Sequence, residues 1–447
     1  MVSGVWRPPV PIDGHIFVYG RTGSGKTFKA MSIFQFYFEK GYKAWDVYGG
    51  KRKEGSFWAI PSDEKKLWFK YEQAVGKMKE RGPKEYNVNL YIPYLKTNLE
   101  DVKEVPEMLP RIRTKIFTIY WKSIEPKHIA TLSGEVTENQ KRVWTELKDQ
   151  LSDDAGPDEI LSWFNRNENT KFQNNPLYYT FIKPLCKQKI LQGKDCPYNI
   201  DLIAEAKEKD RVFVLNEDYT PLEFRMFLMS YITTKLYDLV NEEKIHHKNI
   251  VYFREMNLFM KVQDESAQDA QQKQILRNEV SDVIRYGRSG LHIIGDTQSP
   301  SEVKGLVEGQ EDLLCINELP GARDREEACD QLRRDKKISK LQIAYIGSMP
   351  IEQMVVIGRK DKKVKLLPRV QPPRTMGWKR ETGSFRKVWK NKYNSYKNIQ
   401  DIKKEINNRE AQLNFLKRKA DEVEKDINEV NIKNKPKEEE FEEKWII

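Results

Sequence analysis

The sequence predicts an α/β fold with a mainly parallel sheet, and three observations lead to that prediction. Short apolar runs of four to six residues recur along the chain, as expected for strands that are buried on both faces. Segments with helical spacing separate these runs, and parallel strands need such crossover connections. A glycine-rich loop, residues 20–27, joins the first apolar run to the first helical segment.

Predicted strands and helices alternate on both sides of a long central segment. Before that segment, His15–Tyr19 predicts a strand, Phe28–Glu39 a helix and Lys43–Tyr48 a second strand. We therefore place the core of the fold at residues 1–50 and 205–358. The later part of this core contains two predicted helices, Phe224–Asn241 and Ile275–Tyr286. Its predicted strands are Arg211–Leu215, Asn249–Phe253, Leu291–Gly295, Leu313–Ile316 and Met354–Ile357.

Residues 51–204 form the central segment, where we expect an inserted, largely helical subdomain. This segment is rich in charge, Trp, Tyr and helix formers, and it contains one plausible strand, Lys115–Tyr120. A chain of 447 residues is long enough for a core domain with such appendages. The four cysteines show no zinc-like spacing and are expected to stay reduced thiols; they are Cys186, Cys196, Cys315 and Cys329.

The composition is that of a soluble protein. Charged residues make up 32% and hydrophobic residues 38% of the chain, and the mean hydropathy is -0.74. No apolar run reaches the roughly 18 residues that a membrane span needs. The N-terminus lacks the pattern of a secretory signal. We therefore expect a cytoplasmic protein, or a virus-associated one that acts in a host cytoplasm, with no membrane span.

The net charge of +11 is concentrated in one segment, residues 359–397. It contains 14 Lys or Arg residues against the two acids Asp361 and Glu381, and its prolines make regular structure unlikely. Aromatic residues that could stack on bases are interleaved with the cations: Trp378, Phe385, Trp389, Tyr393 and Tyr396. This basic aromatic linker is predicted to bind nucleic acid; the alternative is a linker whose charge keeps it soluble.

The C-terminal part of the chain predicts a coiled coil at residues 398–432. Apolar residues from Ile399 to Val430 recur at alternating steps of three and four, although a packed two-helix hairpin could use the same stripe. Residues 433–447 form an acidic tail with an apolar tip. The coiled coil and the tail could bind a protein partner, and the alternative for the tail is a frayed terminus.

The glycine-rich loop fits the P-loop pattern G-x-x-x-x-G-K-[ST], and its residues are Gly20, Arg21, Thr22, Gly23, Ser24, Gly25, Lys26 and Thr27. Glycines let backbone N–H groups approach phosphate oxygens, and the following helix directs its positive end at the same anion. Lys26 would neutralise the β and γ phosphates, and the Thr27 hydroxyl would ligate Mg²⁺. The loop predicts that ATP and Mg²⁺ bind here; the alternative is an ordinary Gly-rich turn.

Two segments resemble the HerA/FtsK superfamily of ring-shaped DNA translocases. His15–Thr27 is similar to the Walker A segment of that superfamily, and Asn278–Pro300 looks like its helix, arginine turn and strand ending in Thr-Gln-x-Pro. The resemblance implies a RecA-like P-loop NTPase core and a homo-oligomer, in that superfamily a hexameric ring. It also implies ATP hydrolysis coupled to translocation of double-stranded DNA, in viral genome packaging, DNA transfer or DNA processing.

The resemblance also implies roles for four residues outside the P-loop. Gln298 matches a polar sensor that faces the γ-phosphate and orients the attacking water, the alternative being a Gln that caps a turn. Glu255 matches the carboxylate that polarises this water. Arg288 and Arg285 match an arginine finger that reaches a neighbouring subunit, although either could be a salt-bridged surface residue.

The Walker B segment departs from the superfamily pattern. Arg254 stands where the family has an Asp, and a cation cannot hold Mg²⁺. Metal binding would then depend on Thr27 and the phosphates, or on another acid such as Asp46 or Asp296. This departure leaves a rival hypothesis, an ATP-binding scaffold that hydrolyses weakly or not at all. A P-loop kinase of small substrates is a third and less favoured alternative.

Overall fold

The computed structural model describes twelve segments, and every structural statement below concerns them: residues 14–47, 57–59, 84–94, 111–133, 136–166, 169–215, 222–260, 267–286, 290–303, 311–333, 340–358 and 364–367. The predicted coiled coil and acidic tail lie outside these residues, as does most of the basic aromatic linker. The linker, the coiled coil and the tail therefore remain predictions.

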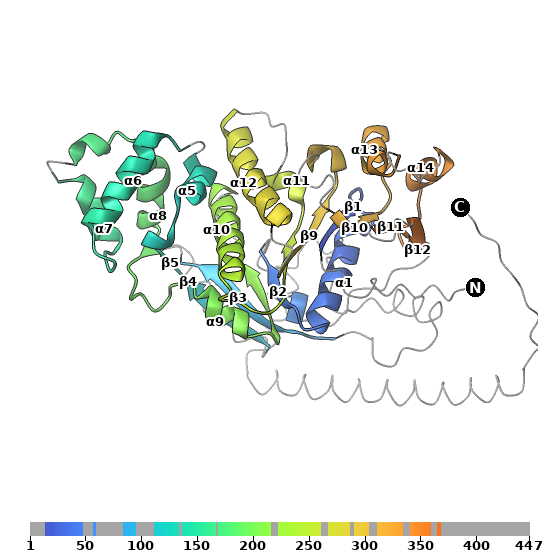
Figure 1. Ribbon diagram of the computed structural model, residues 1–447, viewed down its shortest axis with the longest axis horizontal. Helices are drawn as coiled ribbons and strands as arrows, with labels where there is room; N and C mark the ends of the chain where they lie inside the picture. The colour runs from blue at the N-terminus through green and yellow to red at the C-terminus, as the bar shows by residue number, and fades with distance from the viewer. Residues whose placement is uncertain are drawn as a thin grey trace, which may run out of the picture. The chain divides into compact units, whose positions relative to one another are not determined.

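A ten-stranded mixed sheet forms the centre of the described fold (Figure 1). Its strands, in spatial order, are β12 (Val364–Leu367), β11 (Met354–Gly358), β10 (Glu311–Ile316), β1 (His15–Tyr19), β9 (Leu291–Thr297), β8 (Asn249–Phe253), β2 (Lys43–Asp46), β7 (Arg211–Leu215), β3 (Asn87–Pro93) and β4 (Ile112–Phe117). All neighbouring pairs from β10 to β4 are parallel, and only the β10–β11 and β11–β12 pairs are antiparallel. The predicted α/β class with a mainly parallel sheet is confirmed.

The order β10-β1-β9-β8-β2 is the strand order of a RecA-type core, with β9 inserted between the strand that enters the loop and the strand that carries the acid. In register, Tyr19 of β1 pairs with Thr297 of β9, and Phe253 of β8 pairs with Gly295. Because these strands are parallel, the residues that follow them lie at one edge of the sheet. This edge holds the candidate site.

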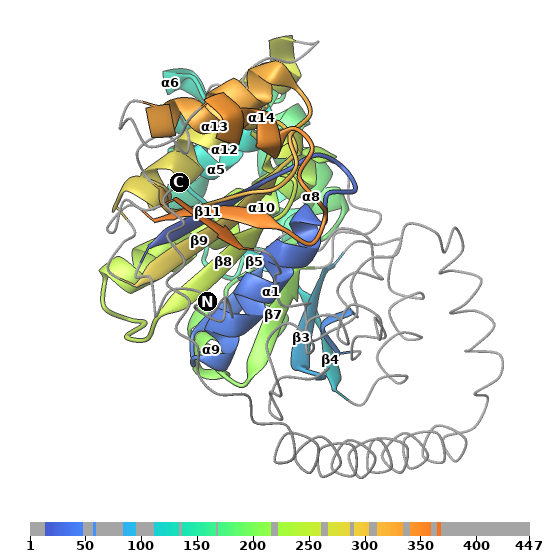
Figure 2. The same cartoon turned by 90° about the vertical axis from the view of Figure 1, so that its right-hand side faces the viewer.

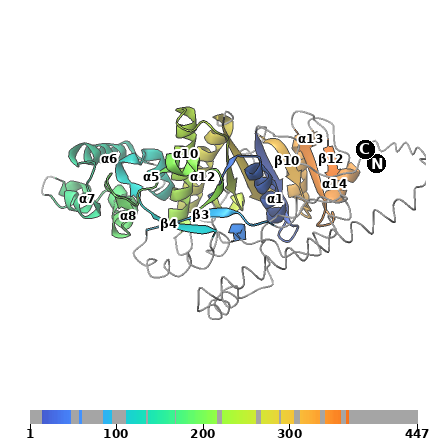
Figure 3. The same ribbon diagram turned by 90° about the horizontal axis from the view of Figure 1, so that it is seen from below.

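Helices cover both faces of the sheet. They are α1 (Lys26–Glu39), α5 (Pro126–Ser133), α6 (Glu138–Gln150), α7 (Pro157–Phe164), α8 (Lys183–Lys187), α9 (Leu202–Lys207), α10 (Leu222–Asn241), α11 (Met256–Phe259), α12 (Ala267–Tyr286), α13 (Ala322–Arg333) and α14 (Lys340–Ile346). Helix α1 packs on one face of β1, β9, β8 and β2 (Figure 2). Helices α10, α11 and α12 contact β9 from the other face, and α5 packs on α10 and α12 (Figure 3).

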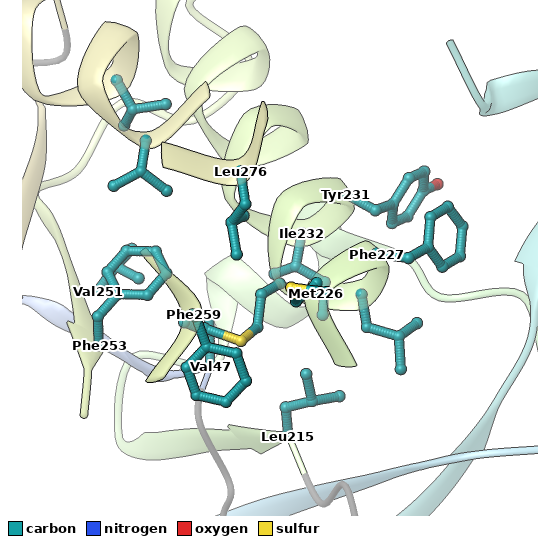
Figure 4. Packing of buried hydrophobic residues seen from close by; sticks show 14 of the residues in the cluster. Val47, Leu215, Met226, Phe227, Tyr231, Ile232, Val251, Phe253, Phe259 and Leu276 are labelled. Carbon is teal, nitrogen blue, oxygen red and sulfur yellow. The ribbon is translucent and has the colours of Figure 1, made fainter. Parts of the chain in front are cut away.

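Alternate residues of β8 serve the two faces. Val251 and Phe253 lie among Met226 and Ile232 of α10 and Leu276 of α12, in the cluster drawn in Figure 4. Ile250 and Tyr252 belong to the separate cluster around α1. Each large apolar side chain contributes about 1.5–3 kcal/mol when it is fully buried. Apolar side chains therefore pack on both faces of β8, the strand that leads to Glu255.

Most predicted elements match the structure within a few residues, and three differences stand out. The predicted strand Lys115–Tyr120 is two strands, β4 and β5 (Ile119–Tyr120), and β5 pairs with β6 (Leu191–Gln192) in a separate two-stranded sheet. The strand β3 was not expected within residues 51–204, which therefore contribute two strands to the main sheet as well as helices. The prediction of irregular structure in the basic linker is wrong at β12, which pairs with β11.

Buried polar residues explain why the pattern of apolar residues did not predict β3. Glu205 of α9 is fully buried and accepts hydrogen bonds from Asn89 (2.8 Å) and Tyr91 (2.8 Å) of β3. It also forms salt bridges with Lys43 of β2 (2.6 Å) and Lys115 of β4 (3.0 Å). Asn89 and Tyr91 of β3 thus point into the protein, where partners distant in the sequence satisfy them.

Two further points bear on the sequence predictions. In the part of the chain that the structure describes, no helix combines the length and the apolar character needed to cross a membrane. All four cysteines are free thiols, and three of them are buried.

Candidate active site

The loop between β1 and α1 has the geometry of an anion cradle. Gly25, the residue before α1, has a left-handed backbone (φ 76°), no side chain caps the helix, and its first turn carries no acid. A helix N-terminus of this kind offers backbone N–H groups and a positive dipole end to an anion. At Gly20 a Cβ atom would lie 2.5 Å from Ser24 Oγ and 2.7 Å from Asn317 Cβ, so only glycine fits. The loop fits nucleotide phosphates.

Neighbouring strand ends hold this loop in place. The N–H of Gly20 donates to the carbonyl of Thr297 (3.2 Å), and that of Arg21 donates to the carbonyl of Glu318 (3.0 Å). The Arg21 guanidinium also pairs with the Glu318 carboxylate (2.8 Å). The loop is therefore tied to the residues that end β9 and follow β10.

Lys26 lies between two carboxylates at the edge of the sheet. Its Nζ is 2.6 Å from Asp296 Oδ1 and 3.1 Å from Glu255 Oε1, and only 3% of its side chain is exposed. Burial lowers the pKa of Lys26, but the charges of Asp296 and Glu255 outweigh that effect and hold the pKa above its ordinary value. Lys26 is therefore a cation with two anionic partners.

Asp296 is the second-last residue of β9 and is fully buried. Besides Lys26, two groups donate to its oxygens: the Tyr252 hydroxyl to Oδ2 (2.7 Å) and the Glu255 backbone N–H to Oδ1 (2.9 Å). Asp296 is thus a positioned, buried carboxylate directly beside the phosphate loop.

The side chains of Glu255 and Gln298 contact each other beside Lys26. Gln298 Nε2 donates to Glu255 Oε2 (2.7 Å), and the hydroxyl of Thr22 in the loop donates to Gln298 Oε1. Glu255 has a left-handed backbone (φ 49°, ψ 50°), a conformation that costs a residue with a side chain about 1–3 kcal/mol. Such strain is tolerated where a side chain must be aimed, and this one turns the carboxylate toward Lys26 and Gln298.

Arg254 does not face the phosphate loop as a metal ligand would. Its Nη2 forms a salt bridge with Asp46 Oδ2 of β2, with 5% and 0% of the two side chains exposed. Trp58 Nε1 donates to the same oxygen (2.8 Å), and the guanidinium carbon lies 5.3 Å from the centre of the Tyr252 ring. Asp46 is therefore committed to Arg254 and Trp58, which disfavours it as the replacement metal ligand.

The predicted arginine finger lies elsewhere. Arg285 is exposed near the end of α12, and Arg288 falls outside the described residues. Helix α12 leads into the start of β9, at the edge of the sheet opposite to the one where Gln298 follows β9. Since β9 has seven residues, it separates the two edges by about 20 Å, so Arg285 is remote from Lys26 of its own chain.

The residues present fit a magnesium-bound nucleotide. Thr27 follows Lys26 in the first turn of α1, and its hydroxyl with the oxygens of Asp296 and Glu255 are the hard donors that Mg²⁺ prefers. Across the described segments, no three His, Cys, Asp or Glu side chains form a group that could hold a metal ion. A cation at this edge would therefore need nucleotide phosphates among its ligands.

The structure brings Lys26, Glu255 and Gln298 together, and two other polar residues at this edge carried less weight in the sequence analysis. Asp296 was considered only as one possible metal ligand, and the visible signal was an acid at the end of a buried strand. Lys29 was not considered: it is 2% exposed, donates to the Gln353 carbonyl (2.6 Å), and burial lowers its pKa to about 7. Its signal, a lysine one turn after Lys26, is too common to be informative.

No protein-family model matches the chain, and no curated protein matches it in sequence. Among solved structures, the chain is similar to the plasmid coupling protein TrwB in complex with the ATP analogue ADPNP, at 13% identity and a TM-score of 0.48, over 85% of this chain and 92% of that one. It is similar to VirB4 of Thermoanaerobacter pseudethanolicus at 10% identity and a TM-score of 0.45, over 80% and 89% of the chains.

A third structure is the genome packaging NTPase B204 of Sulfolobus turreted icosahedral virus 2 with ATP-gammaS, at 11% identity and a TM-score of 0.25, over 40% of this chain and 76% of that one. The predicted RecA-like P-loop core is confirmed as a fold by the loop, the helix after it and the strand order of this chain.

Proposed function

We propose that this protein is an ATP-hydrolysing motor that moves double-stranded DNA. One observation carries the proposal: Lys26 after β1, Glu255 after β8 and Gln298 after β9 meet at one edge of the sheet, beside an uncapped helix N-terminus. These are the groups that phosphoryl transfer to water requires, namely a phosphate cradle with its cation, a carboxylate and a polar amide.

Each group has a role that its position supports. The loop N–H groups and Lys26 bind the β and γ phosphates, and Mg²⁺, when bound, neutralises further phosphate charge. Glu255 accepts a proton or hydrogen bond from the attacking water, and Gln298 orients that water through its amide. In this structure these side chains contact one another, with Gln298 Nε2 2.7 Å from Glu255 Oε2 and Lys26 Nζ 3.1 Å from Glu255 Oε1.

DNA as the polymer that is moved is supported by the chain's sequence. The segments His15–Thr27 and Asn278–Pro300 resemble those of DNA translocases, and the basic aromatic linker at 359–397 follows directly on the core. Lysines and arginines bind the phosphate backbone without reading base sequence, as a translocating motor requires. The coiled coil and acidic tail are proposed to bind a protein partner.

A homo-oligomeric ring, of six subunits in the pattern of the superfamily that the sequence resembles, is supported by the location of Arg285. This residue is exposed and lies at the edge of the sheet away from its own Lys26. An arginine finger in that position can complete only a neighbour's site, and hydrolysis then depends on assembly. Arg285 and Arg288 are both retained as finger candidates.

The test is steady-state ATP hydrolysis with and without linear double-stranded DNA, at low and high salt. We expect DNA to stimulate hydrolysis, the stimulation to weaken with salt, and Glu255→Gln to lower turnover at least about 100-fold while ATP still binds. Glu138→Gln is the matched control, because Glu138 is exposed in the first turn of α6 and should leave turnover unchanged.

Two other results would each replace the proposal. ATP binding without turnover under any condition would identify a nucleotide-binding scaffold, the rival that Arg254 suggests. Turnover that ignores DNA but responds to a small metabolite would identify a kinase-like enzyme instead.

A further inference from the structure

Asp296, the fully buried carboxylate of this site, needs a positive charge beside it. Asp296 is fully buried, and its oxygens accept hydrogen bonds from Tyr252 (2.7 Å) and the Glu255 N–H (2.9 Å). Neither donor carries a charge, and a buried carboxylate without a counter-charge is strongly unfavourable. The counter-charge in this structure is Lys26, whose ammonium lies 2.6 Å away.

When a nucleotide binds, the Lys26 ammonium is needed at the phosphates rather than at the carboxylates. One ammonium group cannot fully neutralise both the phosphates and the two carboxylates that now hold it. When Lys26 turns to the phosphates, Asp296 and Glu255 are left facing a polyanion, with 0% and 24% of their side chains exposed. Solvent screens so little at that depth that a second cation is needed. A divalent cation with a preference for oxygen ligands matches this need.

The strand register shows where Asp296 lies relative to Arg254 and the phosphate loop. Phe253 of β8 pairs with Gly295 of β9, so Arg254, the residue after β8, lies beside Asp296, the second-last residue of β9. Asp296, Tyr252 and Arg254 all lie on the face of the sheet that α1 covers, as their contacts with Lys26 and Asp46 show. Since β9 is the neighbour of β1, Asp296 is nearer to the phosphate loop in the order of strands than any residue of β8.

We propose that Asp296 supplies the metal-binding carboxylate that Arg254 cannot supply, and that it exchanges cations during nucleotide binding. Asp296 is neutralised by Lys26 in the nucleotide-free protein and by the divalent cation of the bound nucleotide once Lys26 contacts the phosphates. Tyr252 and the Glu255 N–H hold the carboxylate in place throughout. The inference deepens the proposed function and rests on nucleotide binding at this loop.

The test measures binding rather than turnover. Mn²⁺ serves as the probe with the non-hydrolysable analogue AMPPNP, and bound Mn²⁺ is followed by electron paramagnetic resonance. Asp296→Asn is expected to lower the affinity for Mn²⁺ in the ternary complex about 10–100-fold. In EDTA the same variant should bind AMPPNP as tightly as the wild type or more tightly, because Lys26 is released from its ion pair.

Two further variants make the test specific. Asp312→Asn is the matched control: Asp312 accepts from the His15 N–H (3.0 Å) at the start of β1, at the other edge of the sheet, and its Mn²⁺ affinity should be unchanged. Tyr252→Phe removes one hydrogen bond to Asp296 and should give a smaller loss than Asp296→Asn. Circular dichroism and the melting temperature confirm that each variant is folded.

Wild-type Mn²⁺ affinity in folded Asp296→Asn would overturn the inference and leave Asp296 as a counter-ion of Lys26 alone. That result is distinguishable from failure of the motor proposal. A wild-type protein that binds Mn²⁺ and AMPPNP through Asp296 but shows no DNA-stimulated turnover would sink the motor and leave this inference standing.

Discussion

Removing the Arg254 side chain is expected to destabilise the core of this protein strongly. Arg254 and Asp46 form a salt bridge in which 5% and 0% of the side chains are exposed. In Arg254→Ala, the Asp46 carboxylate stays buried and keeps the Trp58 donor at 2.8 Å but loses its counter-charge. Breaking a buried pair by removing one partner costs about 3–5 kcal/mol.

Contacts of the Arg254 guanidinium with two aromatic rings raise the expected loss of stability toward the middle or upper part of that range. The guanidinium carbon lies 5.3 Å from the centre of the Tyr252 ring and 5.9 Å from that of Trp58. Buried cation–π contacts of this kind contribute about 0.5–2 kcal/mol. We therefore expect Arg254→Ala to lower the free energy of unfolding by about 4 kcal/mol.

Urea unfolding followed by tryptophan fluorescence measures this change. Lys141→Ala is the control, because it breaks an exposed pair with Glu138 (2.6 Å; 45% and 88% exposed) and should cost no more than about 0.5 kcal/mol. The double variant Arg254→Met with Asp46→Asn should recover most of the loss, since neither charge remains. A loss below about 1 kcal/mol in Arg254→Ala would refute the argument that this pair is buried and mutually dependent.

Two other predictions concern stability. Gly295→Ala should cost about 1–3 kcal/mol in urea unfolding, because its Cβ would lie 2.1 Å from Met256 Sδ and 3.0 Å from Phe17 Cδ1; a neutral result would mean that this contact relaxes freely. His128 is buried with Nε2 2.7 Å from Thr234 Oγ1, and burial lowers its pKa from 6.5 to about 3. The unfolded chain therefore binds the extra proton first, so the stability that neutral His128 provides is present above pH 6.5 and is lost as the pH falls toward 3. Between pH 6.5 and about 5 the wild type should lose about 2 kcal/mol, and His128→Gln should lose clearly less; equal slopes would contradict this assignment.

The sequence alone was sufficient where structure is determined by neighbours along the chain. The P-loop needs glycines at set positions between a strand and a helix, and this local requirement is visible in residues 20–27. Strands buried on both faces need continuous apolar runs, so β1, β7 and β8 were predicted with the bounds that the structure has. The positions of Glu255 and Gln298 at strand ends follow from the same patterns.

Only the tertiary structure decided which charged groups meet. Lys26 and Asp296 are separated by 270 positions in the chain, and Arg254 and Asp46 by 208. In β3, the polar residue Asn89 is buried because Glu205, 116 positions away, accepts its hydrogen bonds. Apolar periodicity reports whether a side chain is buried, but the stability of a buried charge depends on its partner, and partners come together only when the sheet forms.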